Sequence, residues 1–560
     1  MHNTILRSKL MVKFSGVFAL AFALAGLTAV AEPDILRSVE DGELRLPDFS
    51  YAGYKHSVEE IPNPKGKQID ITTFGAIAND GLDDSQAILK ALDKAHATKG
   101  SVVVLFPQGK FIVSEVLKIK RSNIVLRGTG AAEGGTTLFF PRPLKMVDKG
   151  ESLQKLNEYL VEYDKKQREK QHNIDELFSE YSWSGGFIWI QKEGTQAAGY
   201  LEKYDPEINI LASALEGEAG AMTVTVDSAR SLKKGEVLEL LWFNRKGENG
   251  PLLKEIYGDT KLKIGSHHWT RAERPLVRQK TQILAIDGDL ITISDPLLHS
   301  ISSDIPAQFA EWSHLEEVGV EEMHLQFPEA PSFGHHLEQG YNGVYLTSVY
   351  NGWIRNVNIT NADSGVLSYN SANITIGNIR SEGMRRGHYA IHAGNVHNVL
   401  VENLFINNPL IHSLSFNTQS TKSVFKNAHV FKTPVLDQHA GSNHQNLFDN
   451  VHLYITALRD SKGRAHYPIW NGSGAPYWQP GHGRYNTTWN LQVTVEGGAS
   501  RDEKVLLHGK EEGPQARIVG VSGNRQFDVN YRPTPYLEAI NETMRDVPSL
   551  FDWQLKKRLQ

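Results

Sequence analysis

The sequence predicts an all-β protein folded as a parallel β-helix, a solenoid in which short strands stack coil upon coil. The first observation is a short phrase that returns five times, each time around an asparagine: Asn356, Asn378, Asn403, Asn427 and Asn450. The second is the spacing, because intervals of 22, 25, 24 and 23 residues are typical of a solenoid repeat. The third is the alternation of apolar and polar residues around each asparagine, which indicates strands with one buried face.

The repeated asparagine predicts a bend at the same place in every coil. Asparagine tolerates the left-handed backbone conformation, and its side chain bonds to nearby backbone groups. We therefore expect the asparagines to stack on one another along one corner of the solenoid. A β-sandwich with regularly spaced strands is the rival fold, but it would not need the same residue at every corner.

The composition excludes several classes of function. The chain has 560 residues, of which 40% are hydrophobic, enough for a large core that extends along one axis. The net charge of −5 and a pI of about 6.5 give no basic field, so no nucleic-acid partner is expected. Cysteine is absent, which excludes disulfides, thiolate metal sites and a cysteine nucleophile.

The first 31 residues have the pattern of an export signal. Arg7, Lys9 and Lys13 precede the apolar run 14–27, and Ala29-Val30-Ala31 offers a small-residue cleavage site. The run is short for a membrane-spanning helix, and no other stretch is long and apolar enough to be one. We expect the mature protein to be secreted or periplasmic, without membrane insertion.

The following segments are expected to start the solenoid. Residues 32–67 are polar and rich in proline, as in an arm that lies on the first coils. Residues 68–146 predict a cap and the first coils, with a helix at 84–95 whose N-terminus is capped by Asp83 or Asp84. The apolar face of this helix consists of Ala87, Ile88, Ala91 and Leu92.

Part of the sequence resembles a known superfamily. The phrase FGAIANDGLDDSQAILKAL at 74–92, followed by VVVLFPQGKFIV at 102–113 and NIVLRGTG at 123–130, is similar to the N-terminal cap and first coils of the pectate-lyase-like, right-handed parallel β-helix superfamily. This superfamily includes polysaccharide lyases, glycoside hydrolases such as polygalacturonases, epimerases and phage tailspikes. The resemblance is close over 68–140 and extends by pattern over 315–455. It implies a right-handed coil, a helix that seals the open end, and a polysaccharide as partner.

Two insertions are expected to interrupt the coils. Residues 147–199 are highly charged, with leucines at helical spacing, and predict a helical insertion. Residues 200–305 contain strand-like runs and predict a small inserted β-subdomain. The main coils then follow at 306–463, and residues 464–560 are expected to form an aromatic loop (464–489), further coils and a final helix at 548–559.

A second motif points to a functional face. His392-Ala393-Gly394 recurs as His439-Ala440-Gly441, 47 residues or two coils later, and His412 lies on the coil between them. Equivalent positions on adjacent coils lie about 4.8 Å apart, so distant residues can form one row. We expect this row to include the nearby polar residues Arg385, Arg386, His388, Tyr389 and Asp437.

These residue types suit cleavage of an acidic polysaccharide by β-elimination. The reaction needs a cation to neutralise a uronate carboxylate, a base to take the adjacent proton and an acid to protonate the leaving oxygen. We assign Arg386 to the first task and His412 and His439 to the other two. Support is expected from His388, Tyr389 and Asp437. The expected substrate-binding residues are His392, Arg385, Asn417, Trp470, Tyr477, Trp478, His482 and Arg484.

Two alternatives remain open. A glycoside hydrolase would need two carboxyl groups, for which Asp437 with Glu382 or Asp363 are the candidates, whereas Asp449 lies in the bend phrase and is expected to be structural. The polygalacturonase motifs are missing from the coils. A non-catalytic, polysaccharide-binding β-helix is the other alternative.

No metal or other cofactor is predicted. Neighbouring residues on a strand point to opposite faces, so His335 and His336 are not expected to bind one metal ion. Calcium is used by many members of the superfamily, but it needs several converging carboxylates, and the coils offer few. His397 and His444 are expected to stack in turns. The sequence makes no prediction of the oligomeric state or of the particular polysaccharide.

Overall fold

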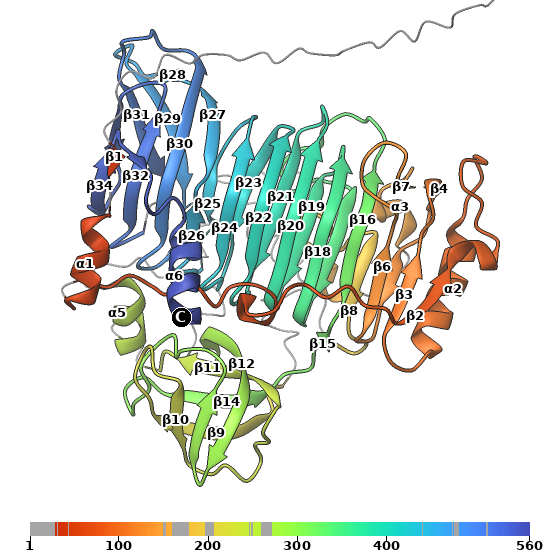
Figure 1. Ribbon diagram of the computed structural model, residues 1–560, viewed down its shortest axis with the longest axis horizontal. Coiled ribbons are helices and arrows are strands. Elements are labelled where there is room, and N and C mark those ends of the chain that lie inside the picture. The colour runs from red at the N-terminus through yellow and green to blue at the C-terminus, as the bar shows by residue number, and fades with distance from the viewer. Residues whose placement is uncertain are drawn as a thin grey trace, which may run out of the picture.

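Two long parallel sheets run through a stack of coils, with a small barrel beside them (Figure 1). The computed structural model describes residues 29–30, 32–42, 44–148, 153–158, 178–195, 207–245, 247, 250–258, 272–439, 441–472, 474, 481–510 and 513–560. The predicted right-handed parallel β-helix is confirmed. One apolar core fills the interior of the coils from Ile69 to Tyr531.

The strands divide between the two sheets. The first sheet contains β2 (Lys67–Asp70), β3 (Val102–Leu105), β4 (Gly109–Ile112), β6 (Ile124–Arg127), β7 (Thr136–Phe139), β15 (Leu315–Glu316), β16 (Gly319–Gln326), β18 (Val349–Thr360), β20 (Ala372–Glu382), β22 (Leu400–Asn407), β24 (Val424–Val430), β26 (Leu447–Asp449), β27 (His452–Thr456), β30 (Thr487–Gly497), β32 (Arg517–Gly523) and β34 (Tyr536–Ile540). The second contains β5 (Leu117–Ile119), β8 (Ile188–Gln191), β17 (Asn342–Thr347), β19 (Ser364–Tyr369), β21 (Gly387–Gly394), β23 (Leu410–Phe416), β25 (Leu436–Gln438), β28 (Leu458–Arg459), β29 (Ala465–Asn471), β31 (Val505–Lys510) and β33 (Phe527–Asn530).

The asparagine corner is present as predicted. All five repeated asparagines have left-handed backbone, with φ between 52° and 57°. Their side chains form a ladder across the coils: Asn378 Nδ2 donates to Asn356 Oδ1 at 2.9 Å, and Asn427 Nδ2 donates to Asn403 Oδ1 at 3.2 Å. Asn450 Nδ2 continues the ladder to Asn427 Oδ1 at 2.8 Å. Each asparagine therefore satisfies a bend that a residue with a branched side chain would strain.

Among the described residues the helices are few, and they lie outside the two sheets. They are α1 (Asp34–Glu40), α2 (Ser85–Ala97), α3 (Leu144–Val147), α5 (Pro251–Tyr257) and α6 (Leu550–Leu559), with the 3-10 turns η1 (Tyr54–Ser57) and η2 (Ile71–Phe74). Helix α2 covers the first coil, begins after Asp84 and buries the predicted apolar face. Among the described helices, none combines the length and the apolar character needed to cross a membrane.

The N-terminal arm (residues 32–67) differs from the expectation that it lies only on the first coils. It starts at the last coils, where Ile35 and Leu36 pack in one cluster with Val519 and Leu550. It then crosses the face of the first sheet toward α2 (Figure 1), and Tyr54 packs against coils near the other end. The arm thus ties the two ends of the solenoid together.

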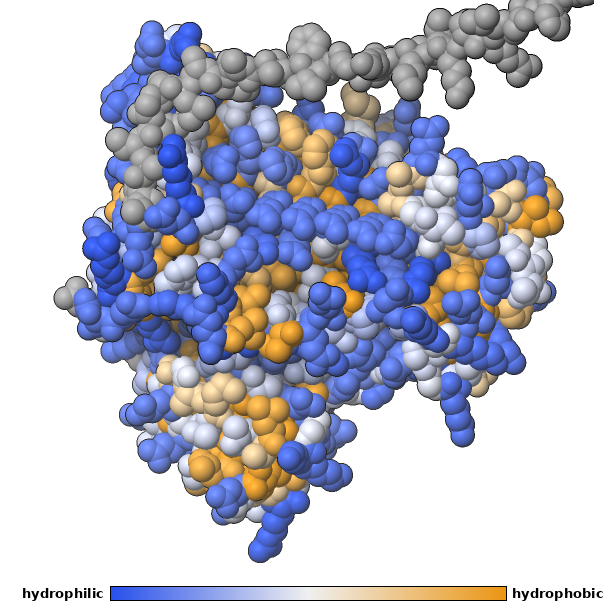
Figure 2. Space-filling model, viewed as in Figure 1, coloured by the Kyte–Doolittle hydropathy of each residue, from blue (hydrophilic) through white to orange (hydrophobic). Residues whose placement is uncertain are grey.

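The predicted inserted β-domain is a closed six-stranded barrel. Its strands are β9 (Ile210–Glu216), β10 (Thr223–Val226), β11 (Val237–Phe243), β12 (Pro275–Asp287), β13 (Leu290–Ile293) and β14 (Ala307–Glu311). Strand β14 lies beyond the bound at 305 expected from the sequence, because it completes the barrel between β11 and β9. Figure 2 shows apolar side chains on the surface of the barrel, where Leu215, Leu284 and Leu290 are among the exposed large hydrophobic residues.

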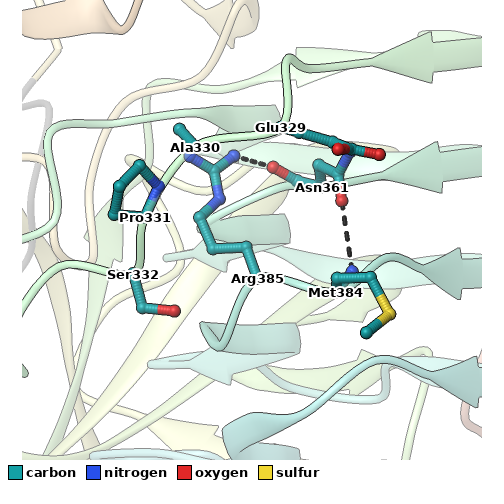
Figure 3. A pocket seen from close by; sticks show the side chains of 7 residues that line it. All are labelled: Glu329, Ala330, Pro331, Ser332, Asn361, Met384 and Arg385. Atoms are coloured by element: carbon teal, nitrogen blue, oxygen red, sulfur yellow. Dashed lines mark hydrogen bonds between the residues drawn. The ribbon is translucent and has the colours of Figure 1, made fainter.

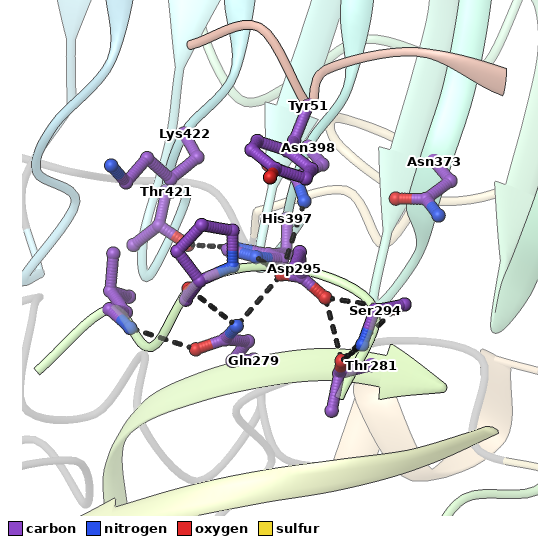
Figure 4. A network of polar contacts seen from close by, with 12 residues as sticks. Tyr51, Gln279, Thr281, Ser294, Asp295, Asn373, His397, Asn398, Thr421 and Lys422 are labelled. Carbon is purple, nitrogen blue, oxygen red and sulfur yellow. Dashed lines mark hydrogen bonds and ion pairs between the residues drawn. The ribbon is translucent and has the colours of Figure 1, made fainter. Parts of the chain in front are cut away.

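The barrel contacts the coils through a buried polar network, here called the junction, formed by Gln279, Thr281, Asp295, His397 and Thr421 (Figure 4). Asp295 Oδ2 accepts a hydrogen bond from Gln279 Nε2 at 2.7 Å and lies 2.9 Å from His397 Nε2. Asp295 Oδ1 accepts from Thr281 Oγ1 at 2.6 Å. The other ring nitrogen of His397 lies 2.8 Å from Thr421 Oγ1. His397 is therefore structural, as expected.

Several expected segments fall on residues that the structure does not describe. The predicted export signal, 1–31, lies outside the described residues except for β1 (Ala29–Val30), which pairs with β35 (Thr543–Met544). About half of the helical insertion, 147–199, also lies outside them, and within its described part β8 is a strand of the second sheet rather than a helix. The expected aromatic loop at 464–489 is not all loop, because β29 and the start of β30 are strands of the two sheets.

Candidate functional site

Three neighbouring strands of the second sheet, β21, β23 and β25, carry the predicted site. They lie side by side in register, so that His392 pairs with Ser415 and Ser415 pairs with Asp437. The repeated motif is therefore out of register by two residues, because Asp437 rather than His439 occupies the position equivalent to His392. Sequence identity misled the alignment of these coils, although the interval of two coils is correct.

Asp437 lies between two imidazoles at the centre of the site. His412 Nδ1 is 3.3 Å from Asp437 Oδ2, and His439 Nδ1 is 3.5 Å from Asp437 Oδ1. Ser415 Oγ donates a hydrogen bond of 2.5 Å to Asp437 Oδ2. Asp437 is fully buried and the His439 side chain is 22% exposed, so the group opens to solvent at His439.

More aromatic side chains pack around His412. Tyr389 stacks on it with ring centroids 5.1 Å apart, and Tyr389 also stacks on His388 at 4.1 Å. His392 meets the edge of Tyr389 at 4.7 Å, and its Nε2 lies 3.2 Å from Tyr369 Oη. We call His388, His392, His412, Asp437 and His439 the histidine cluster. The sequence correctly predicted that these five residues come together.

The cluster contains one anion and two imidazoles, those of His388 and His392, that burial keeps neutral. Burial raises the pKa of the Asp437 carboxyl, but His412 and His439 outweigh burial and hold that pKa below its ordinary value. Burial lowers the pKa of His392 to about 3 and places the pKa of His388 well below its ordinary value. At neutral pH the folded protein therefore holds the Asp437 carboxylate close to the uncharged rings of His388 and His392.

Many polar atoms of the cluster are buried without a hydrogen bond. Both ring nitrogens of His388 and of His412 lack a partner among the described residues, as does Asp437 Oδ1. An unsatisfied buried polar group costs about 1–3 kcal/mol, so such groups are rare in structures. Their concentration at one place marks the cluster as a candidate functional site.

A turn between β16 and β17 covers the cluster, and sequence reasoning did not place it there. His335 and His336 lie in this turn rather than on a strand, and His336 has left-handed backbone with φ of 68°. Their rings are 3.9 Å apart, and the His335 ring is 4.8 Å from that of His388. The argument that the two side chains diverge was wrong, because it assumed a strand. The one sequence signal was the phrase Gly334-His335-His336-Leu337-Glu338.

The two arginines differ in exposure. Arg385 is buried, donates through Nη2 to the Asn361 backbone oxygen and lies 3.7 Å from Asp363 Oδ1. It lines a hollow of about 460 Å³ (Figure 3) together with Glu329, Ala330, Pro331, Ser332, Asn361 and Met384. Arg386 is exposed, and its charge adds to the larger effects of burial and of His412, which lower the pKa of His335. Arg386 therefore belongs to the rim of the site, whereas Arg385 lines a hollow to which no residue of the histidine cluster contributes.

Several expected substrate-binding residues have other partners. Trp470 is buried in the coil core and donates to Thr488 Oγ1, because β29 turns this side chain inward; the prediction that it lines a sugar cleft was wrong. Asn417 is buried, and its Oδ1 accepts from the backbone N–H of Thr418. Tyr477 and Trp478 lie outside the described residues.

His482 and Arg484 occupy the segment between β29 and β30. His482 Nε2 accepts a hydrogen bond of 2.5 Å from the Gly513 backbone N–H, and burial lowers its pKa to about 4 against the opposing charge of Asp437. It therefore lies within the electrostatic reach of the cluster. Arg484 donates to Gln515 Oε1 at 2.7 Å and to the Glu255 backbone oxygen at 3.0 Å. The Arg484 guanidinium thus bonds to α5 and does not line an open surface.

The carboxylates offered for hydrolysis are engaged elsewhere. Glu382 lies on the first sheet and pairs with Arg380 at 2.7 Å, and Asp363 pairs with Arg385. Asp449 accepts from Ser549 Oγ and from two backbone N–H groups at the start of α6, so it is structural, as expected. The geometry does not favour a pair of catalytic carboxyl groups around Asp437.

Calcium, which the superfamily resemblance brings into consideration, does not fit the donor set here. Calcium prefers six to eight oxygen ligands, mostly from carboxylates and carbonyls. The cluster and the turn offer imidazole nitrogens with two carboxylates, Asp437 and Glu338. No catalytic step is assigned to calcium.

Comparison with known proteins agrees with the resemblance found in the sequence. The family model described as "Rhamnogalacturonase A/epimerase, pectate lyase-like" matches residues 68–179. No curated protein sequence matches the chain.

Solved structures that align with the chain have low sequence identity. The phage phi297 tailspike gp61 of Pseudomonas is 14% identical over 84% of this chain and 78% of its own, with a TM-score of 0.38. The A-module of the Azotobacter vinelandii mannuronan C-5 epimerase AlgE4 is 12% identical over 85% and 97%, with a TM-score of 0.36. The family 28 exopolygalacturonase of Yersinia enterocolitica is 11% identical over 85% and 79%, with a TM-score of 0.32. The matched segment covers the N-terminal cap and first coils, and the strand pairing described above gives the parallel β-helix.

Proposed function

We propose that this chain is an exported enzyme that degrades polysaccharides, and specifically a lyase that cleaves a uronate-containing chain by β-elimination. The observation that carries the proposal is the His412–Asp437–His439 group on adjacent coils, with an unpartnered nitrogen on His412 and an opening at His439. The export part rests on the signal-like pattern of residues 1–31.

The group has the parts that elimination requires. His412 takes the proton from the carbon next to the uronate carboxylate, and the electron pair left behind forms a carbon–carbon double bond. The bond to the leaving oxygen then breaks, and His439 donates a proton to that oxygen. Asp437 stabilises whichever imidazole carries the extra proton, as a buried carboxylate does beside a catalytic histidine.

Arg386, at the rim of the site, is the residue that recognises the substrate. Arg386 is exposed beside the turn and offers a planar, bidentate partner for the uronate carboxylate. Neutralising that carboxylate makes the adjacent proton more acidic. Tyr389 stacks on the His412 ring and is itself stacked on His388, which keeps the His412 ring in place.

The test uses purified protein with alginate, pectate, glycosaminoglycans and algal sulfated glycans. Near-ultraviolet absorbance of an unsaturated uronate and new reducing ends are recorded together. We expect both signals to appear on one acidic polysaccharide and to be lost in His439→Ala. The control is His429→Ala, which changes an exposed histidine on the first sheet. Reducing ends without absorbance would indicate a hydrolase, and binding without any product would indicate a passive binding protein; either result contradicts the proposal.

A further inference from the structure

The turn that covers the histidine cluster is held in place by its own contacts. The Ser179 backbone N–H donates to the His336 backbone oxygen at 2.7 Å, and the Arg386 backbone N–H donates to Ser332 Oγ at 2.9 Å. The edges of Phe178 and Trp183 pack against the His336 ring, with centroids 4.4 and 5.2 Å away. The His336 ring is therefore positioned before any ligand binds.

Three imidazoles converge beneath this turn. One ring nitrogen from each of His335, His336 and His388 lies within 4.8 Å of the other two. Bonds from zinc to imidazole are about 2.0–2.1 Å long, so the nitrogens that bind one ion lie somewhat closer together than 4.8 Å. His335 is exposed, and rotation of its side chain can close the remaining gap.

The same place contains a histidine that the chain leaves unsatisfied. His388 is 0% exposed, and neither of its ring nitrogens has a hydrogen-bond partner among the described residues.

A carboxylate stands behind the converging rings. Glu338 Oε1 lies 3.3 Å from His388 Nδ1, and Glu338 Oε2 is buried without a partner. Histidines that bind a metal through one ring nitrogen commonly direct the other toward a carboxylate, which fixes the ring and increases its basicity. Glu338 has the position of such a partner for His388.

We propose that His335, His336 and His388 bind one divalent transition-metal ion of the zinc class, with Glu338 orienting His388. Nitrogen ligands favour zinc and its neighbours over calcium or magnesium. Three protein ligands leave a fourth position open, and the His412 ring lies 5.4 Å from that of His388 on the adjacent strand. The ion would thus adjoin the His412–Asp437–His439 group. The site stands on its own geometry, whatever reaction the protein catalyses.

The test measures binding of zinc alone to the full chain without a polyhistidine tag. Calorimetric titration and metal analysis after gel filtration give affinity and stoichiometry, and Co²⁺ gives a visible absorption band that reports nitrogen coordination. We expect about one equivalent of zinc per chain and at least about 10-fold weaker binding in His335→Ala and His336→Ala. His335 is exposed, so its replacement is not expected to disturb folding, and the unfolding temperature in a chelator checks this.

Matched variants separate this site from other histidine pairs. His466 and His508 lie close together on β29 and β31, with ring nitrogens 2.9 Å apart, and His466→Ala should leave zinc binding unchanged. Absence of zinc binding in the unaltered protein at micromolar free zinc would overturn the proposal. So would undiminished binding in His335→Ala and His336→Ala, including the case in which only His439→Ala removes the ion. Because none of these readouts is activity, they remain decisive even if the proposed lyase reaction is wrong.

Discussion

The junction and the histidine cluster contain the same chemical groups, but these groups differ in how completely they are hydrogen-bonded. In both, a buried aspartate lies within about 3.5 Å of histidine nitrogens. At the junction, Asp295 and His397 have hydrogen-bond partners on both sides (Figure 4). In the cluster, His412 Nδ1 has only the 3.3 Å ion pair with Asp437, and His412 Nε2 has no partner among the described residues. Full satisfaction is typical of a group that holds two parts together, whereas unsatisfied groups are available for a substrate or ion.

The largest expected effect comes from removing the charge of the cluster. Asp437→Asn keeps the shape of the side chain but removes the anion that stabilises a protonated imidazole. We expect turnover to fall by about 10²–10⁴-fold, the range of a lost acid–base contribution. Initial rates of product absorbance measure this. Asp287→Asn, at an exposed aspartate of the barrel, is the control and should keep the normal rate.

The matching change at the junction should affect stability instead. Asp295→Ala leaves His397 and Gln279 buried without their partner, which is expected to cost about 3–5 kcal/mol in the free energy of unfolding. Denaturant titration measures this loss. Activity of the folded fraction should be unchanged. An effect below about 0.5 kcal/mol, the size expected for a surface change, would contradict the structural role.

The dependence of the free energy of unfolding on acidic pH also tests the structural role of the junction. Burial raises the pKa of Asp295, but His397 outweighs it and lowers that pKa from 3.8 to about 2. The pKa of Asp295 is lower in the folded protein than in the unfolded chain. The stabilisation from the ionised carboxylate is therefore complete above pH 3.8 and is lost as the pH falls from 3.8 toward about 2. We expect about 2 kcal/mol of pH-dependent stability here that Asp295→Asn lacks. If the free energy of unfolding of the unaltered protein and of Asp295→Asn changed in parallel with pH, this prediction would be wrong.

A smaller effect is expected from the hydroxyl that supports Asp437. Ser415→Ala removes the 2.5 Å hydrogen bond to Asp437 Oδ2. A hydrogen bond to a charged group contributes about 1.5–3 kcal/mol, so turnover should fall by about tenfold or somewhat more. The matched change Ser423→Ala removes a buried hydroxyl on the first-sheet side of a coil and should leave the turnover rate unchanged.

Most of the fold could be predicted because its main signal is local. Each repeated asparagine marks its own bend, and alternation around it marks its own strand, so neither needs knowledge of distant residues. The path of the N-terminal arm could not be predicted, because it depends on contacts between Ile35 and residues more than 480 positions away, such as Val519. The inward orientation of Trp470 likewise depends on β29 joining the sheet.

The sequence predicted which residues of the cluster come together, but it did not predict how they are arranged. Spacing brought His392, His412 and Asp437 to adjacent coils, but the exact register required backbone pairing that the repeated motif does not encode. The turn with His335 and His336 lies over the cluster through contacts to Ser179 and Arg386, and the sequence near the turn carries no sign of these. Its contribution is therefore visible only in three dimensions.

We expect histidines that lack hydrogen-bond partners in the cluster to act in catalysis, and fully hydrogen-bonded histidines at the junction to support the fold. Product absorbance and the free energy of unfolding of His412→Ala and His397→Ala distinguish these roles. His412→Ala is expected to lose activity while its unfolding free energy stays close to that of the unaltered protein. The reverse is expected for His397→Ala, with activity kept in the folded fraction and stability lost. Full activity in His412→Ala would contradict this expectation.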